Sequence, residues 1–261
     1  MAGTLLIDRP IDGVLRLSIS NPCKRNALDL EILDAIAAAL GSLDGVRCVV
    51  LTGCDGVFSA GYDIGTIEPE LFASVAEKLV AQPFGAALTA LDEAQVPTLA
   101  ALSGSAIGGG LELALGCDLR IASGATKLGM PPAKLGLTYS HTGLRRFLNA
   151  IGEPRTRELF LLGRYIDAQT ALNWGLVNWV VPHADLDDAA LELAAQLAAN
   201  APLAMAGNKR VLRELLRAEA TIDPDVEREL LALRESSFAS DDLREGVSAF
   251  AEKRPPSWKG R

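Results

Sequence analysis

The feature that most constrains the fold is a repeated alternation of short β-rich runs with amphipathic helical patterns. A helical stripe over residues 30–40 follows Asp29 as a candidate N-cap, and another begins at Leu111, directly after a run of glycines. The β-rich runs, each closed by Gly, Pro, Ser or Asn, cover residues 14–19, 46–52, 97–103, 118–122 and 177–181. This alternation predicts an α/β fold with parallel strands joined by helical crossovers.

The C-terminal part of the chain has a different pattern. After about residue 183 the β-rich runs stop, and helical patterns cover residues 186–199, 203–219, 226–236 and 241–252. Pro202 and Pro224 stand where helices begin, a position that tolerates proline. We therefore expect a core over residues 1–183 and a C-terminal helical region over 184–261 that serves oligomerisation and cleft closure.

Composition and charge restrict the partners. The chain has 261 residues, is 49% hydrophobic and carries a formal net charge of −8. Nucleic acid and anionic membranes require clustered positive charge, so neither is an expected partner. No apolar run is long enough to cross a membrane and no leader precedes residue 10, which predicts a cytoplasmic protein. A small molecule, including an anionic one held by local Lys and Arg, fits better.

Several common chemistries lack their motifs. The four cysteines form no C-x-x-C pair and lie in or beside apolar segments, which predicts buried free thiols. His141 and His183 are the two histidines of the sequence and neither has a ligand at metal spacing, so no metal site is expected. The glycine cluster at 104–110 fits neither G-x-G-x-x-G nor a P-loop, and no G-x-S-x-G elbow surrounds Ser59 or Ser105.

Two glycine-containing turns remain as candidates for chemistry. Ser59-Ala60-Gly61 follows one predicted strand, and Gly108-Gly109-Gly110 follows another and leads directly into a helix. Glycines let the backbone approach a ligand closely, and the N–H groups of a first helical turn have no partners within the helix. Both turns can therefore direct backbone N–H groups at a developing negative charge.

The order of these motifs resembles that of the crotonase, or enoyl-CoA hydratase/isomerase, superfamily. The likeness runs along nearly the whole chain and comprises Asn26-Ala27-Leu28, Phe58-Ser59-Ala60-Gly61-x-Asp63, the glycine run through Glu112, Cys117-Asp118, Gly175-Leu176-Val177 and the tail from Glu245 to Arg254. The resemblance implies a crotonase-like spiral of ββα units followed by a C-terminal helical region. It also implies assembly as a homotrimer or a dimer of trimers.

The resemblance assigns roles to particular residues. The N–H groups of Ala60 and Gly109 would bind the thioester oxygen of an acyl-coenzyme A and stabilise an enolate. Coenzyme A would enter as part of that substrate, with no tightly bound cofactor. The positions that would contact the coenzyme are Lys24, Arg25, Ala27, Asp63, Ile64 and, in the tail of the same or a neighbouring subunit, Phe250 and Lys253.

One departure from the family pattern bears on the reaction. Hydratases of the family use two carboxylates; Glu112 matches the first, but Pro132 stands where the second would be. A positioned acid or base contributes about 10²–10⁴ in rate, so this departure argues against ordinary two-glutamate hydration. It also weakens double-bond isomerisation, which in the family depends on the missing carboxylate.

Downstream of Pro132, the segment around Tyr139 resembles methylmalonyl-CoA decarboxylases, in which a Tyr at this position helps to hold the substrate carboxylate. Those relatives carry a His where this chain has Tyr62, and His141 is the candidate to replace it. The leading expectation is hydratase/isomerase-family chemistry through a thioester enolate, with Glu112 as the acid/base. The alternatives are decarboxylation of a malonyl-CoA-type substrate and non-catalytic binding of acyl-CoA.

Overall fold

A computed structural model describes residues 2–63, 82–219 and 222–261 of the chain. Its main feature is a six-stranded sheet in the order β1-β2-β3-β4-β6-β9, parallel except for the antiparallel edge strand β1. The strands are β1 (Thr4–Asp8), β2 (Val14–Ser20), β3 (Cys48–Gly53), β4 (Thr98–Leu102), β6 (Leu119–Ser123) and β9 (Trp179–Val181). The five predicted strands are thus confirmed, and β1 is the strand of this sheet that the sequence patterns missed.

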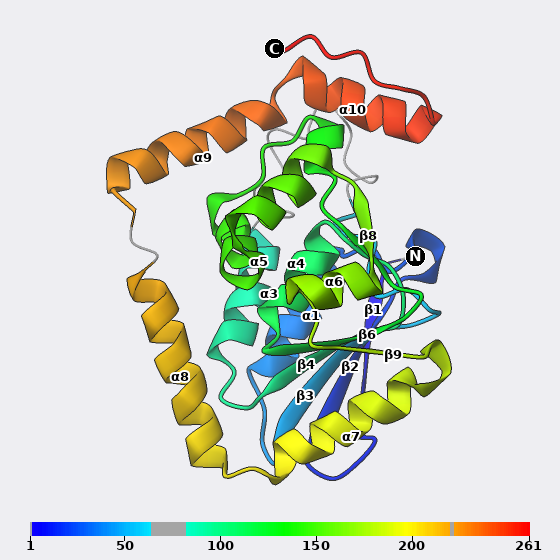
Figure 1. Cartoon of the computed structure of the whole chain (residues 1–261), viewed down its shortest axis with the longest axis vertical. Helices are drawn as coiled ribbons and strands as arrows, with labels where there is room; N and C mark the ends of the chain where they lie inside the picture. The colour runs from blue at the N-terminus through cyan, green and yellow to red at the C-terminus, as the bar shows by residue number, and fades with distance from the viewer. Residues whose placement is uncertain (1, 64–81, 220–221) are drawn as a thin grey trace.

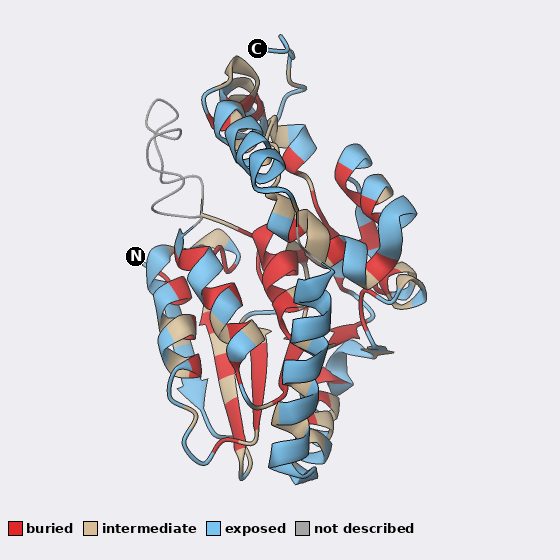
Figure 2. Cartoon of the chain, turned by 90° about the vertical axis from the view of Figure 1, so that its left-hand side faces the viewer, coloured by how far each residue is buried: buried red, intermediate tan, exposed pale blue. Residues whose placement is uncertain are grey.

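The central strands β3 and β4 are buried on both faces because both faces of the sheet are covered there. In β3, Val49 and Leu51 belong to the cluster under the crossover helices, whereas Cys48 and Val50 face the opposite layer. Successive strand residues point to opposite faces, so a run that is buried throughout needs a layer on each side. Figure 2 shows the resulting buried strands between exposed helices.

One layer consists of helices α1 (Leu30–Leu40), α3 (Gln82–Glu93) and α4 (Gly109–Gly116), which pack on one another and on the sheet. The predicted N-cap of α1 is confirmed, because the Asp29 carboxylate accepts a hydrogen bond from the Ile32 N–H at 3.0 Å. The helix after the glycines is confirmed too, although it begins at Gly109 itself.

A second, three-stranded sheet lies beside this layer. It contains β5 (Ala106–Ile107), β7 (Lys127–Gly129) and β8 (Tyr165–Asp167), and Ser59 adds an isolated parallel bridge to Ala106. Two further helices, α5 (His141–Leu162) and α6 (Ala168–Trp174), follow in the chain. The bridge from Ser59 brings the two predicted glycine turns next to each other.

The four C-terminal helices lie close to their predicted bounds. They are α7 (Leu186–Ala199), α8 (Pro202–Ala218), α9 (Pro224–Phe238) and α10 (Asp241–Glu252). Helix α7 covers the second face of the main sheet, with Leu186, Ala190 and Ala194 buried against β2, β3, β4 and β6. The core therefore continues beyond residue 183, and the helices that extend from it in Figure 1 begin with α8.

Three expectations concern groups that bind or react. The structure contains no disulfide among its four cysteines; Cys48 and Cys117 are buried, but Cys23 is exposed, so the prediction of buried thiols is wrong there. Burial raises the pKa of both Cys48 and Cys117 to about 12. Within residues 2–63, 82–219 and 222–261, no cluster of His, Cys, Asp and Glu is arranged to hold a metal ion. No helix of this part is long and apolar enough to span a bilayer.

Candidate active site

The two glycine-containing turns leave the carboxyl ends of two neighbouring parallel strands, β3 and β4. The backbone ties them together: the Ser59 N–H donates to the Ser105 carbonyl at 3.1 Å, and the Ile107 N–H donates to the Ser59 carbonyl at 3.0 Å. The carboxyl ends of parallel strands are where α/β proteins commonly place ligands. The topology thus brings both predicted turns to one such place.

A buried asparagine holds the first turn in position. The Asn26 amide donates to the carbonyls of Cys54 and Val57 at 2.8 and 2.7 Å, and its side-chain oxygen accepts from the Asn21 N–H at 2.8 Å. Each bond satisfies a backbone group that the turn would otherwise leave unpaired. The family motif around Asn26 therefore has a structural role here, which sequence reasoning did not assign.

The first turn offers a different N–H from the predicted one. The Ala60 N–H donates to the Arg25 carbonyl at 3.1 Å, so it is occupied within the protein, and the Gly61 N–H donates to the Ser59 hydroxyl at 3.1 Å. The expectation that Ala60 supplies a free donor is therefore wrong. Among the described residues the Tyr62 N–H meets no backbone acceptor, because its neighbours Gly61 and Asp63 make the bridge to Leu28.

The second turn offers the predicted donor. Gly109 is the first residue of α4, so its N–H has no acceptor within the helix. A Cβ on Gly61 would lie 3.4 Å from the Gly109 nitrogen and 2.8 Å from the Ile107 carbonyl oxygen, and Gly61 has a φ of 94°. A residue with a side chain at position 61 would have an unfavourable backbone conformation, and its Cβ would clash with the Ile107 carbonyl oxygen. Because Gly61 has no Cβ, the N–H groups of Tyr62 and Gly109 can come together.

Glu112 lies one turn into α4 and is buried, with 2% of its surface exposed. Its Oε2 accepts a hydrogen bond from the Tyr139 hydroxyl at 2.5 Å, and its Oε1 lies 4.0 Å from Arg146 Nε. Burial raises the pKa of Glu112, while the hydrogen bond from Tyr139 and the charge of Arg146 partly oppose that rise. This carboxyl group can therefore hold a proton more readily than an exposed glutamate.

Tyr139 reaches Glu112 because the first turn of α5 contains a glycine, Gly143. A Cβ on Gly143 would lie 2.6 Å from the Tyr139 ring and 2.9 Å from Glu112 Oε1. The Gly143 N–H donates to the hydroxyl of Ser140, the N-cap of α5, at 3.0 Å. The cap sets the direction of the helix, and Gly143 leaves room for the ring and the carboxylate. The structure thus brings together two of the predicted catalytic residues.

Tyr62 completes this group, although the sequence gave it no catalytic role. A Cβ on Gly109 would lie 2.9 Å from Cζ of the Tyr62 ring, and the ring packs edge-on against Phe84 at 4.8 Å between centroids. Burial raises the pKa of the Tyr62 hydroxyl well above its usual value, with a further contribution from the charge of Glu112. In the sequence, the feature that could have identified Tyr62 as a site residue is its position directly after Gly61 of the first turn.

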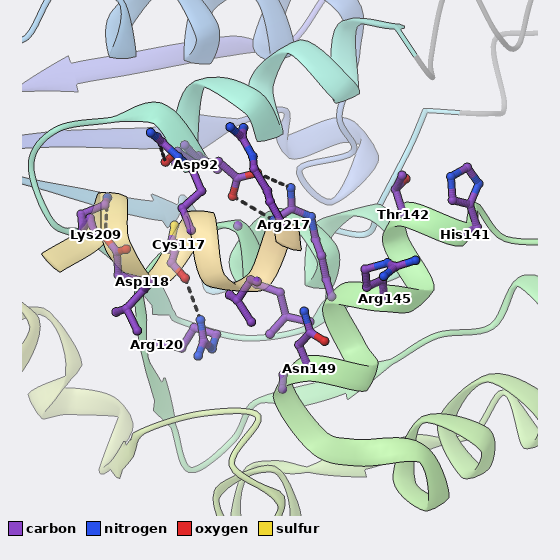
Figure 3. Close-up of a pocket in the computed structure, with 18 of the residues that line it drawn as sticks. Asp92, Cys117, Asp118, Arg120, His141, Thr142, Arg145, Asn149, Lys209 and Arg217 are labelled. Atoms are coloured by element: carbon purple, nitrogen blue, oxygen red, sulfur yellow. Dashed lines mark hydrogen bonds and ion pairs between the residues drawn. The ribbon is translucent and has the colours of Figure 1, made fainter. Parts of the chain in front are cut away.

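His141 is only two residues from Tyr139 but lies on a different side of α5. Its Nε2 is 3.4 Å from a carboxylate oxygen of Glu227 in α9, and its side chain lines a cavity of about 720 Å³ between α5 and α8. Figure 3 shows this cavity with His141 at one end and the Lys209–Asp118 pair at the other. None of Tyr62, Gly109, Glu112 and Tyr139 lines it. The structure therefore does not bring His141 to the other predicted catalytic residues.

Pro132 begins a short 3-10 helix, Pro132–Leu135, and is buried. Its ring carries no ionisable group, and α10 packs against this segment from outside. The position that holds a second carboxylate in related hydratases thus has a structural role in this chain.

The residues predicted to contact the coenzyme fall into two groups. Lys24 Nζ lies 2.5 Å from Asp63 Oδ2, and Arg25 adopts a φ of 54°, while Ala27 is buried. Phe250 is 73% exposed on α10, and Lys253 is its exposed C-cap. Ile64 lies outside the described residues. Lys24 and Asp63 are thus brought together, whereas within the described part of the chain Phe250 and Lys253 form no hydrogen bond or ion pair with them.

The comparisons with known proteins agree with this architecture. The model of the enoyl-CoA hydratase/isomerase family matches residues 10–261, so the chain belongs to that family. It is 34% identical, over the full length of both chains, to the putative enoyl-CoA hydratase/isomerase YngF of Bacillus subtilis. It is 35% identical to carnitinyl-CoA dehydratase of Salmonella agona, over 95% of both chains.

Solved structures give the same result. Methylmalonyl-CoA decarboxylase in complex with 2-nitronate-propionyl-CoA superposes with a TM-score of 0.90 at 29% identity and covers 99% of both chains. Enoyl-CoA hydratase from Bacillus anthracis superposes with a TM-score of 0.76 at 29% identity, covering 99% of this chain and 100% of its own. The predicted crotonase-like α/β fold is confirmed, and the protein is an enzyme of this family.

Proposed function

We propose that the protein acts on an acyl-CoA thioester and stabilises its enolate in an oxyanion hole formed by the N–H groups of Tyr62 and Gly109. The observation that carries this proposal is the contact of the two turns at Gly61, beside the buried carboxyl of Glu112. Two backbone donors directed at one oxygen stabilise developing negative charge, and loss of one such donor typically costs about 3–4 kcal/mol of transition-state stabilisation. Tyr62 takes the place that the sequence assigned to Ala60.

Glu112 is the proposed proton carrier of this reaction. Its raised pKa keeps a proton available for delivery to the enolate carbon, and its ionised form can accept one. The hydrogen bond from Tyr139 and the charge of Arg146 each oppose this rise in the pKa of Glu112. Hydration, dehydration and decarboxylation in this family all require such an exchange of a proton at the carbon next to the thioester.

Among these reactions, decarboxylation of a malonyl-CoA-type substrate is the second, more specific proposal. Pro132 removes the second carboxylate that would activate water, whereas loss of carbon dioxide needs an oxyanion hole and one proton donor. The similarity in fold to methylmalonyl-CoA decarboxylase supports the same choice. In this reading the Tyr139 hydroxyl helps to hold the leaving carboxylate, and His141 has no catalytic part.

The coenzyme is proposed to lie along the first turn. Lys24 and Arg25 supply positive charge next to the turn, Asp63 orients Lys24, and the tail residues Phe250 and Lys253 close over the coenzyme in the same or a neighbouring subunit. An anionic substrate on an acidic protein needs such local cations, because the net charge repels it. Replacing Lys24 by Gln should raise KM for the CoA thioester without a matching fall in kcat.

The protein is also proposed to associate with itself, as a trimer or a dimer of trimers. Helix α8 has no buried residue, and its apolar side chains are exposed: Leu203, Val211, Leu212, Leu215 and Leu216. An apolar stripe of this kind on a monomer indicates an interaction surface. Light scattering after gel filtration should give at least three times the mass of the chain, and a mass of one chain would contradict this proposal.

Turnover of two substrates separates the reactions. The purified enzyme is incubated with methylmalonyl-CoA and with crotonyl-CoA, and carbon dioxide release and loss of the enoyl absorbance are followed. Because one proton carrier suffices for the first reaction and not for the second, we expect decarboxylation to be at least about 10²-fold faster than hydration. Faster hydration would exclude the decarboxylase proposal. Absence of both activities, together with absence of CoA binding in calorimetry, would exclude the function altogether.

A further inference from the structure

The cavity between α5 and α8 contains none of the proposed catalytic groups and is bounded by one face of each helix (Figure 3). The α8 residues of its wall fall at the i, i+3, i+4, i+7 and i+8 spacing of a single helix face: Lys209, Leu212, Arg213, Leu216 and Arg217. Helix α5 contributes a second such face, which contains Arg145 and Asn149. The volume, about 720 Å³, lies within the range of about 300–1,000 Å³ that is typical of small-molecule sites. The cavity is therefore large enough for a ligand of its own.

The carboxylates of the cavity wall already have basic partners. Each of the three lies against one basic side chain, in the pairs Asp92–Arg146, Asp118–Lys209 and Glu227–His141. Four further arginines of the wall form no hydrogen bond with a carboxylate in the described part of the chain: Arg120, Arg145, Arg213 and Arg217. The wall therefore has more positive than negative charge, although the chain as a whole carries a net charge of −8.

Two of these arginines, Arg213 and Arg217, are four residues apart and thus neighbours on α8. Arg213 Nη1 donates to the Asp92 backbone carbonyl at 3.0 Å, but its buried Nε finds no hydrogen-bond acceptor among the described residues. A Glu214 carboxylate oxygen lies 3.5 Å from that Nε. Arg217 lies 3.7 and 3.8 Å from the carboxylates of Glu93 and Glu214, beyond ordinary hydrogen-bond distance. Both guanidinium groups thus retain N–H groups for another acceptor, and a buried N–H without an acceptor is costly.

The chemistry of this wall suits a phosphate group. A guanidinium presents its N–H groups in a planar fork that matches two phosphate oxygens, and a phosphate ester carries about two negative charges. A single carboxylate carries one charge and would leave more of the arginine charge uncompensated. Apolar side chains, Leu91 and Leu115 among them, also line the cavity and can hold the remainder of a small phosphate ester.

We propose that this cavity is a second ligand site, which binds the phosphate group of a small molecule through Arg213 and Arg217. The site is separate from the proposed acyl-CoA site, because neither Lys24 nor Arg25 lines the cavity. The proposed catalytic groups do not line it either, so the proposal does not depend on which reaction the enzyme performs.

Calorimetry with inorganic pyrophosphate tests the site, because this probe supplies phosphate groups without an acyl or nucleoside part. The titration is done with propionyl-CoA at saturation, so that the acyl-CoA site is filled. Arg217→Gln and Arg213→Gln should each weaken pyrophosphate binding by about tenfold or more, the usual consequence of losing a charge-assisted hydrogen bond. The matched control is Arg210→Gln, since Arg210 is an exposed arginine of the same helix that does not line the cavity. It removes the same charge and should change the affinity by less than about twofold.

The two arginine variants also separate binding from structure. Arg213 ties α8 to the Asp92 carbonyl, so a loss of binding in Arg213→Gln alone would reflect this structural bond and would contradict the proposal. Equal affinities of Arg217→Gln and Arg210→Gln would contradict it too, because general electrostatics would then suffice. Absence of pyrophosphate binding by the wild type, as expected if a second copy fills the cavity, would overturn the site, as would binding that propionyl-CoA abolishes. Failure to bind propionyl-CoA would instead contradict the proposed function, and titration with pyrophosphate alone would still test the cavity.

Discussion

Two carboxylates on opposite sides of Arg146 have different surroundings. On the cavity side, Asp92 accepts both Arg146 Nη1 and Nη2, at 3.0 and 2.6 Å, and so forms a bidentate ion pair. On the catalytic side, Glu112 lies 4.0 Å from Arg146 Nε and receives its short hydrogen bond from a neutral hydroxyl. The arginine thus belongs mainly to Asp92, and Glu112 is left buried with only partial compensation.

This difference in pairing with Arg146 indicates a structural role for Asp92 and a role in proton transfer for Glu112. Paired and hydrogen-bonded charges stabilise the contact between elements, as Asp92 does for α3 and α5 and as Asp118 does with Lys209 of α8. A buried carboxyl without a bidentate partner changes its protonation state more readily, because burial disfavours the charged form. Arg146 of α5 therefore has a structural partner, Asp92 of α3, on one side and the proposed proton carrier, Glu112 of α4, on the other.

The largest expected effect is on turnover. Glu112→Gln keeps the shape of the side chain and removes its ability to carry a proton, so kcat should fall by about 10²–10⁴. The matched control is Glu227→Gln, on the cavity side, which pairs with His141 and should stay within about twofold of the wild type. Equal effects of the two variants in a steady-state assay would remove the distinction between the two sides.

The next effect concerns the pH dependence. Arg146 lowers the pKa of Glu112, so Arg146→Gln should raise it further. If the protonated carboxyl delivers the proton, the descending limb of the kcat–pH profile should move to higher pH. Arg145→Gln, which changes a neighbouring cavity residue, should leave the limb in place. A shift to lower pH in Arg146→Gln would contradict the assigned role of Arg146.

A smaller effect is expected on stability. The pKa of Glu112 is raised in the folded state, so the folded protein binds more protons than the unfolded chain and loses stability as pH rises from the unfolded value toward the folded one. The Glu112→Gln variant has no titrating group at this position, so its stability does not fall with pH for this reason. Its melting temperature relative to the wild type should therefore be higher at pH 8 than at pH 4, by about 2–4 °C for each kcal/mol recovered. A difference that does not change with pH would show that Glu112 does not titrate on unfolding.

The smallest effect is predicted for His141→Ala. His141 contacts Glu227 at 3.4 Å across the cavity, and such a partly exposed pair contributes about 0–1 kcal/mol. Turnover should change by less than about twofold by the same argument. A larger loss in kcat would show that His141 takes part in the reaction despite its position.

Local sequence patterns were sufficient for most of the fold. The strand runs and the four C-terminal helices follow from the periodicity of their own residues, and their predicted bounds agree with the structure to within a few residues. Helix α5 was not anticipated, because Gly152, at a φ of 73°, and Pro154 interrupt its pattern. The sequence patterns also did not predict that α7 covers the sheet. This packing depends on which apolar face of the sheet the crossover helices leave uncovered, and that cannot be read from the residues of α7 alone.

The candidate site was predicted in part. Gly109, Glu112 and Tyr139 were found because the glycine run and the acid belong to one local motif. Ala60 was assigned in place of Tyr62 because the acceptor of its N–H is the carbonyl of Arg25, 35 positions earlier, in a left-handed turn that no local pattern reveals. The direction of His141 similarly depends on α9, which is distant in sequence.

The central claim is that the two turns bind an enolate better than they bind its parent thioester. A CoA thioester with a nitronate at the α-carbon carries the negative charge and planar geometry of an enolate, and calorimetry can compare its affinity with that of propionyl-CoA. Enolate stabilisation predicts that the nitronate binds at least about 10²-fold more tightly, as expected for an analogue of the charged intermediate. Equal affinities of the two thioesters would contradict the account.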